Sequence, residues 1–182
     1  MTEKSLLNLD VKILRLNENT IIQSFDCEDK DLNDFLLNDS KNYLNSRLSV
    51  TYLLQSKEET VAYFSLSNDS LIKDDEETAT WNKINRAIPN PKRRKAYPAV
   101  KIGRLAVAKK YAGMGFGKLI IMAVREMYVN EQQRSGCRFV TVDAYRNALP
   151  FYEKNDFRFL TTKDANDDTR IMYFDLMLTV ND

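Results

Sequence analysis

The stretch RLAVAKKYAGMGFGKLIIMAV, residues 104–124, decides the fold. It holds three of the chain's five glycines, Gly113, Gly115 and Gly117, and continues into an apolar run with helical spacing. The residues before it, 99–108, have the pattern of a strand. A strand, a glycine loop and a helix start in succession leave backbone N–H groups unpaired at the positive end of the helix dipole. The stretch therefore predicts an anion site, usually for phosphate.

Two familiar phosphate loops do not fit this spacing. A P-loop has four residues between its glycines and then Lys followed by Ser or Thr, whereas three residues separate Gly113 from Gly117 here, and Leu119 follows Lys118. The dinucleotide fingerprint reads G-x-G-x-x-G, whereas GMGFG reads G-x-G-x-G, and no second strand ends in an acidic residue about 20 residues later. A purely structural turn explains one glycine more readily than three.

The composition limits the function classes. The 182 residues fit one domain, expected to span residues 1–182. Neither a leader at residues 1–16 nor an apolar run of about 18 residues is present, so we expect a cytoplasmic protein. Cys27 and Cys137 are too far apart for a disulfide framework. The absence of histidine excludes Ser-His-Asp and Cys-His relays and His-containing zinc sites, and no metal is expected.

Basic residues are concentrated in one segment. Residues 78–125 contain twelve Lys or Arg and no Asp or Glu, although the formal net charge of the chain is only +1. One face of the folded protein is therefore a candidate basic surface. The run KRRK (Lys92, Arg93, Arg94 and Lys95) belongs either to a substrate-binding face or to a solvated loop, and both interpretations remain open.

Hydrophobic periodicity predicts an alternating order of elements. We expect strands over residues 11–16, 48–55, 60–67, 99–108, 138–144, 157–161 and 171–178, and helices over 31–45, 115–134 and 148–155. Asp29 or Asp31 is the expected cap of the first helix. Residues 68–98 are expected to form a long connection with a short helix around 81–88, and this connection is the best candidate for a substrate lid.

The glycine loop resembles the acetyl-CoA loop of the GNAT superfamily of N-acetyltransferases. The family pattern is Arg/Gln-x-x-Gly-x-Gly/Ala after a strand of the type L-x-V, and LAVAKKYAGMGFGKLI matches it at Leu105, Val107, Gly115 and Gly117. Ala112 stands where the family has Arg or Gln, which removes one side-chain contact to the pyrophosphate but leaves the backbone cradle.

A second family element, an Ala followed by YEKxGF, is matched by Ala148 and by FYEKNDF at residues 151–157. Asp156 replaces the glycine of this element, and Tyr145 occupies the usual Asn position. The resemblance implies a single mixed α/β domain. Its central sheet would have about seven mostly antiparallel strands, a splayed fourth and fifth strand, and helices on both faces.

The resemblance also implies a reaction, the transfer of an acetyl group from acetyl-CoA to a primary amine by direct attack. The backbone of residues 105–107 would pair with the pantetheine arm, and an N–H there would polarise the thioester carbonyl. Tyr152 would protonate the leaving thiolate, unless its ring only packs. No carboxylate in residues 78–125 offers a general base, which favours an α-amine partly neutral near pH 7. The cofactor-binding residues implied are Leu105, Ala106, Val107, Ala112, Gly113, Met114, Gly115, Phe116, Gly117, Lys118 and Asn147.

The N-terminal half resembles a GNAT subgroup that includes bacterial toxins. The similarity is carried by Phe25, Asp26, Cys27, Leu32, Asn33, Phe35, Leu36 and IGRLAV at residues 102–107. It implies the α-amine of aminoacyl-tRNA as acceptor and a small antitoxin protein as partner. A peptide or small-molecule amine as acceptor, a homodimer, and a catalytically degenerate acetyl-CoA-binding module remain open; Ala112, Tyr145 and Asp156 motivate the last.

Overall fold

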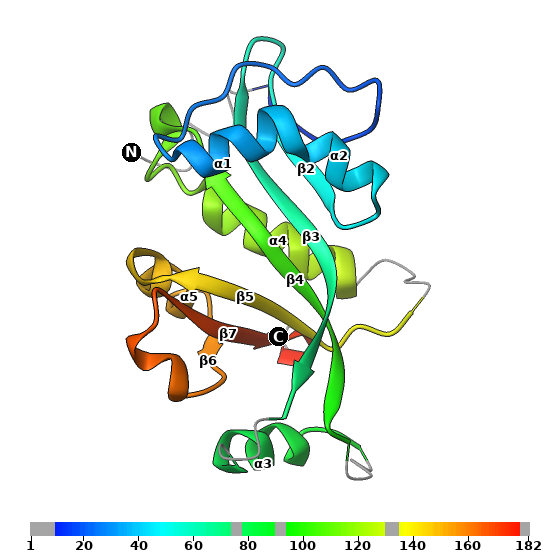
Figure 1. Ribbon diagram of the computed structural model, residues 1–182, viewed down its shortest axis with the longest axis vertical. Coiled ribbons are helices and arrows are strands. Elements are labelled where there is room, and N and C mark those ends of the chain that lie inside the picture. Colours follow the sequence, from blue (N-terminus) through cyan, green and yellow to red (C-terminus); the bar gives the residue numbers. More distant parts are fainter. Residues whose placement is uncertain (1–9, 74–77, 90–93, 130–134, 179–182) are drawn as a thin grey trace. The chain divides into compact units, whose positions relative to one another are not determined.

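The computed structural model describes residues 10–73, 78–89, 94–129 and 135–178 (Figure 1). The chain forms two compact units. The first comprises Met1–Ser67 and Ile102–Ala123, and the second comprises Asn68–Lys101 and Val124–Asp182. Two strands and one helix run through both units, which are described in turn below. The expectation of one domain over residues 1–182 stays a prediction.

The elements follow the alternating order expected from the sequence. The N-terminal part consists of β1 (Lys12–Arg15), α1 (Lys30–Asp34), the π-helical turn η2 (Phe35–Asp39), α2 (Ser40–Asn45), β2 (Val50–Gln55) and β3 (Thr60–Ile72). The middle part consists of α3 (Thr78–Arg86), β4 (Ala96–Val107), η3 (Lys109–Tyr111) and α4 (Phe116–Val129). The C-terminal part consists of β5 (Phe139–Tyr145), η4 (Arg146–Ala148), α5 (Leu149–Glu153), β6 (Arg158–Phe159), η5 (Lys163–Asn166), β7 (Thr169–Asp175) and η6 (Leu176–Leu178).

The seven strands form one mixed sheet in the order β1-β2-β3-β4-β5-β7-β6. The pairs β1–β2, β2–β3, β5–β7 and β6–β7 are antiparallel, and β4–β5 is parallel. The β4–β5 register begins at Ala99 and Phe139 and ends at Lys101 and Thr141, although β4 continues to Val107. The predicted fold class is confirmed, and the short β4–β5 register is what a splay of these strands requires.

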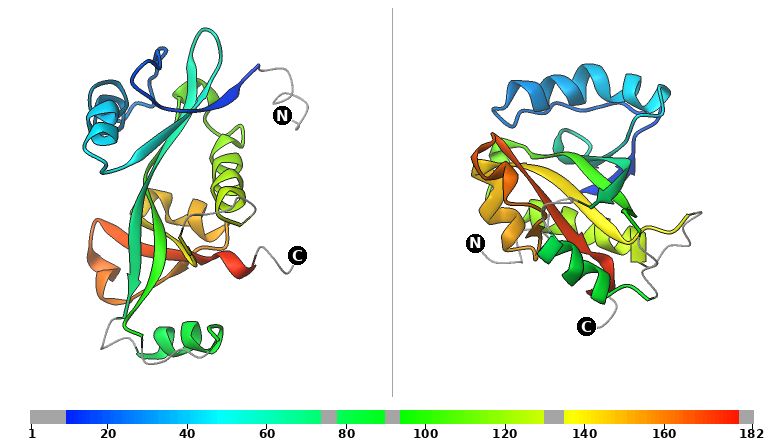
Figure 2. Two further views of the ribbon diagram at one scale, coloured as in Figure 1. Left: turned by 90° about the vertical axis from the view of Figure 1, so that its right-hand side faces the viewer. Right: turned by 60° about the horizontal axis from the view of Figure 1, so that its bottom comes forward.

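In the first unit the N-terminal helical segment, residues 30–45, covers one face of the sheet and α4 lies on the other (Figure 2). Asp29 caps the segment, because its side chain accepts a hydrogen bond from the N–H of Leu32. The segment is fixed to β3 by Tyr63, whose hydroxyl donates to the carbonyl of Leu32 at 2.8 Å and whose ring stacks on Phe35. The predicted helix and cap are confirmed; the π-helical turn inside it was not expected.

In the second unit α3 follows β3 and precedes β4 in the chain, and it lies next to the ends of these two strands (Figure 1). Trp81 stacks on Tyr97 in a buried cluster that also contains Leu71, Ile84, Ala99, Phe139 and Tyr173. Burial of side chains of this size stabilises by about 1.5–3 kcal/mol each. The helix is therefore built into a core.

The predicted boundaries of the long loop at residues 68–98 are wrong, because strands occupy both of its ends. β3 continues to Ile72 and β4 begins at Ala96, because the two strands stay paired there and the N–H of Lys73 donates to the carbonyl of Lys95 at 2.8 Å. The helix inside the connection covers Thr78–Arg86 rather than residues 81–88. A substrate lid in this connection stays a prediction.

The remaining elements differ from expectation mainly at their ends. α4 covers Phe116–Val129, and the rest of the predicted helix, 130–134, lies outside the described residues. The expected strand 157–161 is reduced to Arg158–Phe159, which pair with Tyr173 and Met172 of β7; beyond them Leu160 keeps one hydrogen bond, from its N–H to the carbonyl of Ile171 at 3.0 Å. Within the part of the chain that the structure describes, no helix is long and apolar enough to cross a membrane.

Candidate functional site

The glycine loop of the first unit has the geometry of an anion cradle. Gly113 and Gly115 have φ angles of 75° and 92°, a conformation that glycine adopts without the penalty a Cβ brings. Leu119 donates its N–H to the carbonyl of Gly115 at 3.0 Å, the first hydrogen bond of the α4 ladder. The N–H groups before it have no acceptor within the helix and are available to a bound anion. They belong to Phe116, Gly117 and Lys118.

The loop is braced by a tyrosine and a glutamate. The hydroxyl of Tyr111 donates to Glu59 at 2.6 Å, and the ring of Tyr111 packs edge-on against Phe116, the first residue of α4. Lys110 also pairs with Glu59, at 2.6 Å. Hydrogen bonds from Lys110 and then Tyr111 lower the pKa of Glu59, which keeps this carboxylate ionised. The start of α4 is therefore fixed before any ligand binds.

The strand predicted to hold the pantetheine arm directly precedes the loop. Leu105 and Val107 are half-buried, and Ala106 is buried. On one side the strand is paired with β3, and the N–H of Ala108 donates to the carbonyl of Val61 at 2.8 Å. Its register with β5 does not extend beyond Lys101, so residues 105–107 have no β5 partner among the described pairs. That backbone edge is available to a ligand.

The other predicted cofactor residues in this unit lie in or beside the loop. Ala112 and Lys118 are exposed, and Met114 is half-buried. The structure thus brings ten of the predicted cofactor residues together along one continuous segment, residues 105–118. Asn147, the remaining one, belongs to the second unit and is exposed in η4.

Several basic residues of the segment 78–125 are paired with carboxylates from other parts of the chain. Lys109 pairs with Glu28 and Lys101 pairs with Asp143, in addition to the Lys110–Glu59 pair. A phosphate that contacted these lysines would have to compete with a carboxylate already in place. Among the residues of the predicted substrate run, Arg94 and Lys95 are exposed, and Lys92 and Arg93 lie outside the described residues.

In the second unit Tyr152 lies buried in α5. Its ring packs edge-on against Phe151 and Phe157. Burial raises the pKa of Tyr152, so that its hydroxyl stays protonated at neutral pH and can act as a proton donor. A hydroxyl that stays protonated at neutral pH has a proton to donate.

The two departures from the family pattern near Tyr152 have local explanations. Asp156 has a φ of 64°, the left-handed conformation that explains a glycine at this place, and aspartate tolerates it better than most residues. Tyr145 is 57% exposed at the end of β5, where η4 begins. An exposed ring there does not disturb the fold.

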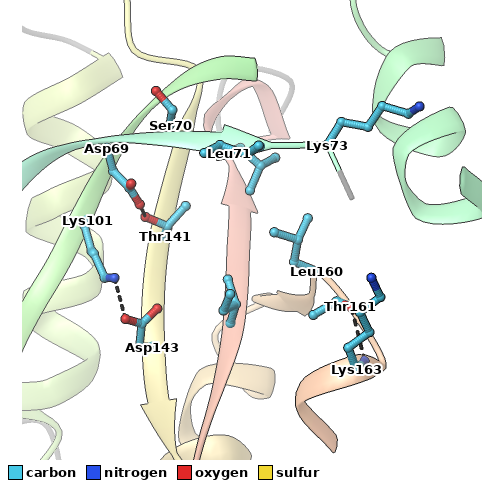
Figure 3. Close-up of a pocket in the computed structure, with 12 residues that line it drawn as sticks. Asp69, Ser70, Leu71, Lys73, Lys101, Thr141, Asp143, Leu160, Thr161 and Lys163 are labelled. Carbon is cyan, nitrogen blue, oxygen red and sulfur yellow. Dashed lines mark hydrogen bonds and ion pairs between the residues drawn. The ribbon is translucent and has the colours of Figure 1, made fainter. Parts of the chain in front are cut away.

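The second unit also contains a cavity that the sequence did not predict (Figure 3). Its volume is about 610 Å³. The ammonium of Lys101 points at the carboxylate of Asp143, and the hydroxyl of Thr141 donates to Asp69. Apolar lining comes from β3, β7 and the segment after β6, namely Leu71, Ile171 and Leu160. Eight of its twelve described lining residues are polar, Lys73 and Lys163 among them, so the cavity combines several charged groups with an apolar wall.

Sequence patterns held one signal for this cavity. In RFVTVDA, Thr141 and Asp143 alternate with apolar residues, so both polar side chains must lie on one face of β5. Asp69 carries no such signal, because residues 68–70 have the composition of a loop, although they belong to β3. The cavity is assembled from elements far apart in the chain.

Comparison with known proteins defines the class. Residues 87–175 match the family described as acetyltransferase (GNAT) domain. The match agrees with the resemblance of the glycine loop, and the predicted enzyme class, an N-acetyltransferase, is confirmed.

Several solved structures share this fold with the whole chain. A mutant of KacT is 20% identical with a TM-score of 0.75, over 94% of this chain and 98% of that one. AtaT complexed with acetyl-methionyl-tRNAfMet is 20% identical with a TM-score of 0.78, over 94% and 98%. A mutant of the AtaT toxin bound to the C-terminus of the antitoxin AtaR and acetyl-CoA is 18% identical with a TM-score of 0.73, over 95% and 99%. The resemblance to the fold of toxin acetyltransferases is confirmed.

Proposed function

We propose that the protein transfers an acetyl group from acetyl-CoA to the α-amine of an aminoacyl-tRNA. The use of acetyl-CoA is supported by the glycine loop. Two of its residues are in the left-handed conformation, and the N–H groups of the first turn of α4 are unpaired within the helix. In this proposal the pyrophosphate binds to the backbone of residues 113–118, and the pantetheine arm pairs with residues 105–107.

The proposed chemistry needs few catalytic side chains. The neutral amine attacks the thioester carbonyl, and a backbone N–H of residues 105–107 stabilises the developing oxyanion. The C–S bond then breaks, and the thiolate takes a proton from Tyr152, whose raised pKa keeps that proton in place until it is needed. The acceptor nitrogen releases its own proton to solvent.

The acceptor is proposed from the solved relatives. AtaT, which has the same fold, is known in complex with acetyl-methionyl-tRNAfMet and with the antitoxin AtaR. By analogy, this chain would act in the cytoplasm, where charged tRNA is found, and pair with a small antitoxin. A second copy of the chain is a further proposed partner.

A peptide or small-molecule amine is the second candidate acceptor. One observation favours it: Lys101, Lys109 and Lys110 are each paired with a carboxylate, which reduces the positive charge offered to RNA.

Acetyl transfer from labelled acetyl-CoA separates these candidates. The acceptors would be mixed aminoacyl-tRNA, the same tRNA after deacylation, a peptide with a free N-terminus, and spermidine. The proposal expects label on charged tRNA alone, released by base as an N-acetylated amino acid. Label on the peptide or spermidine but not on charged tRNA would overturn the acceptor, and no transfer to any of them would favour the binding-module interpretation.

A further inference from the structure

The cavity of the second unit contains a primary ammonium on a carboxylate, beside apolar side chains. Lys101 supplies the ammonium and Asp143 the carboxylate (Figure 3). The apolar side chains belong to Leu71, Leu160 and Ile171. Neither the glycine loop nor Tyr152 lines this cavity, so the site proposed above leaves its role unassigned.

The arrangement follows from the sheet register. Lys101 faces Thr141 in the last pair of the β4–β5 register, and Asp143 lies two residues further along β5, on the same face. On the other side of β5, Asp143 faces Ile171 of β7. A charged group and an apolar group are therefore neighbours in the register at the place where the β4–β5 pairing ends.

The Lys101–Asp143 pair has the features of an exchangeable contact. The two side chains are 32% and 44% exposed, and ion pairs of this exposure contribute little to stability. The pair Arg170–Asp164 in the same unit differs, because its side chains are only 15% and 10% exposed. Asp164 also accepts a hydrogen bond from the N–H of Ile171 at 2.6 Å, which anchors β7. The Arg170–Asp164 pair therefore stabilises the fold, whereas the Lys101–Asp143 pair faces the cavity.

We propose that Asp143 binds the acceptor as its primary ammonium, which takes the place of the Lys101 ammonium; the nitrogen then loses one proton to solvent before it attacks as the neutral amine. The apolar group of the acceptor then lies against Leu71, Leu160 and Ile171. This inference rests on the proposed function and specifies its acceptor as an α-aminoacyl group with an apolar side chain. Since one primary ammonium replaces another on the same carboxylate, the hydrogen bond to Asp143 is conserved, and the displaced Lys101 ammonium turns to solvent.

The two partners of the pair should affect binding in opposite directions. Lys101→Met removes the competing ammonium, so the affinity for an apolar amino-acid ester should rise about two- to fivefold, the range of an exposed ion pair. Asp143→Asn removes the carboxylate, so the affinity should fall by about the same factor, two- to fivefold. A pair with only a structural role would give small changes of the same sign.

The probe is leucine methyl ester, titrated by calorimetry near pH 6.5, about a unit below the usual α-amine pKa, without acetyl-CoA. Lys83→Met, an exposed lysine of α3, is the matched control and should bind like wild type. Because the pair is exposed, both variants should fold, as circular dichroism would verify. Equal affinities in all proteins, or no binding by wild type and Lys101→Met alike, would overturn the inference.

Binding and transfer are separable in this design. Opposite shifts in ester affinity without acetyl transfer to any amine would support the cavity assignment and contradict the proposed function. Transfer to charged tRNA with an acceptor KM that neither substitution changes would support the function and contradict the cavity assignment.

Discussion

Asp156 shows how a single residue can depart from a family pattern without loss of the structure. Its φ of 64° requires a residue that tolerates the left-handed conformation, and glycine and aspartate both do so. The substitution is therefore no evidence for a degenerate enzyme. The same holds for Tyr145, which is exposed at the end of β5.

Substitutions at Asp156 should reveal this constraint in the free energy of unfolding. Asp156→Gly should raise it by up to about 1 kcal/mol, because relief of a left-handed residue is worth about 1–2 kcal/mol and the entropy of glycine costs about 0.5–1 kcal/mol. Asp156→Val should lower it by about 1 kcal/mol or more, since a β-branched side chain is poorly tolerated there. Urea unfolding measures both, and a more stable Val variant would contradict the assignment.

Tyr152 can be tested through its hydroxyl alone. Tyr152→Phe should lower kcat by roughly 10²-fold or more, while the affinity for acetyl-CoA stays nearly unchanged. Tyr145→Phe is the matched control, because it removes a hydroxyl from an exposed tyrosine of the same unit, and it should retain activity. Full turnover by the Tyr152→Phe enzyme would mean that the ring only packs.

The pH profile gives a second test of Tyr152. Its folded-state pKa is raised above the ordinary value of 10.0, so the protonated donor persists at least up to that pH and is lost only above it. The rate should therefore rise with pH as the α-amine of the acceptor deprotonates, without a falling limb below about pH 10. A falling limb near pH 8 that disappears in Tyr152→Phe would contradict a raised pKa.

At the scale of elements, local sequence patterns predicted the helix cap and the glycine loop. They failed where pairing between distant strands determines the structure. The helix capped by Asp29 and the loop at Gly113 and Gly115 were predicted because caps and left-handed glycines depend on a few adjacent residues. The extension of β3 through residues 68–72 was missed, because Asn, Asp and Ser there favour turns. Pairing with the start of β4 overrides that preference.

The glycine loop carries the clearest prediction at this scale. Gly115→Val places a side chain where phosphate oxygens approach and where φ is 92°, so affinity for CoA should fall by roughly tenfold or more, about 1.4 kcal/mol. Gly136→Ala is the control, because a Cβ there meets nothing within 4 Å and its φ is not in the left-handed range. Calorimetry on folded protein measures both, and unchanged affinity in Gly115→Val would remove the pyrophosphate from this loop.

At the scale of the whole molecule, the charge segregation of the sequence does not translate directly into a basic surface. Residues 78–125 hold no carboxylate, yet Glu28, Glu59 and Asp143 come from other segments and pair with its lysines. Such partners, like the cavity, are assembled from distant segments and could not be read from local composition. The fold class and the glycine loop could be predicted from the sequence, because their signals are contiguous.

Salt dependence tests whether the run Lys92–Lys95 contacts RNA. A variant with Gln at Lys92, Arg93, Arg94 and Lys95 should acetylate charged tRNA more weakly, with a flatter dependence on salt, since each lost phosphate contact changes the slope by about 0.7–0.9. Lys57→Gln, in the exposed β2–β3 turn, controls for a general change of charge. Equal salt slopes for wild type and the fourfold variant would show that the run is only solvated.

The central claim is that acetyl-CoA binds along residues 105–118, and a crystal structure with acetyl-CoA tests it most directly. The account predicts pyrophosphate oxygens within hydrogen-bond distance of the backbone N–H groups of residues 113–118, and pantetheine amides paired with the backbone of residues 105–107. Acetyl-CoA ordered elsewhere on the protein, with no phosphate at the start of α4, would contradict it.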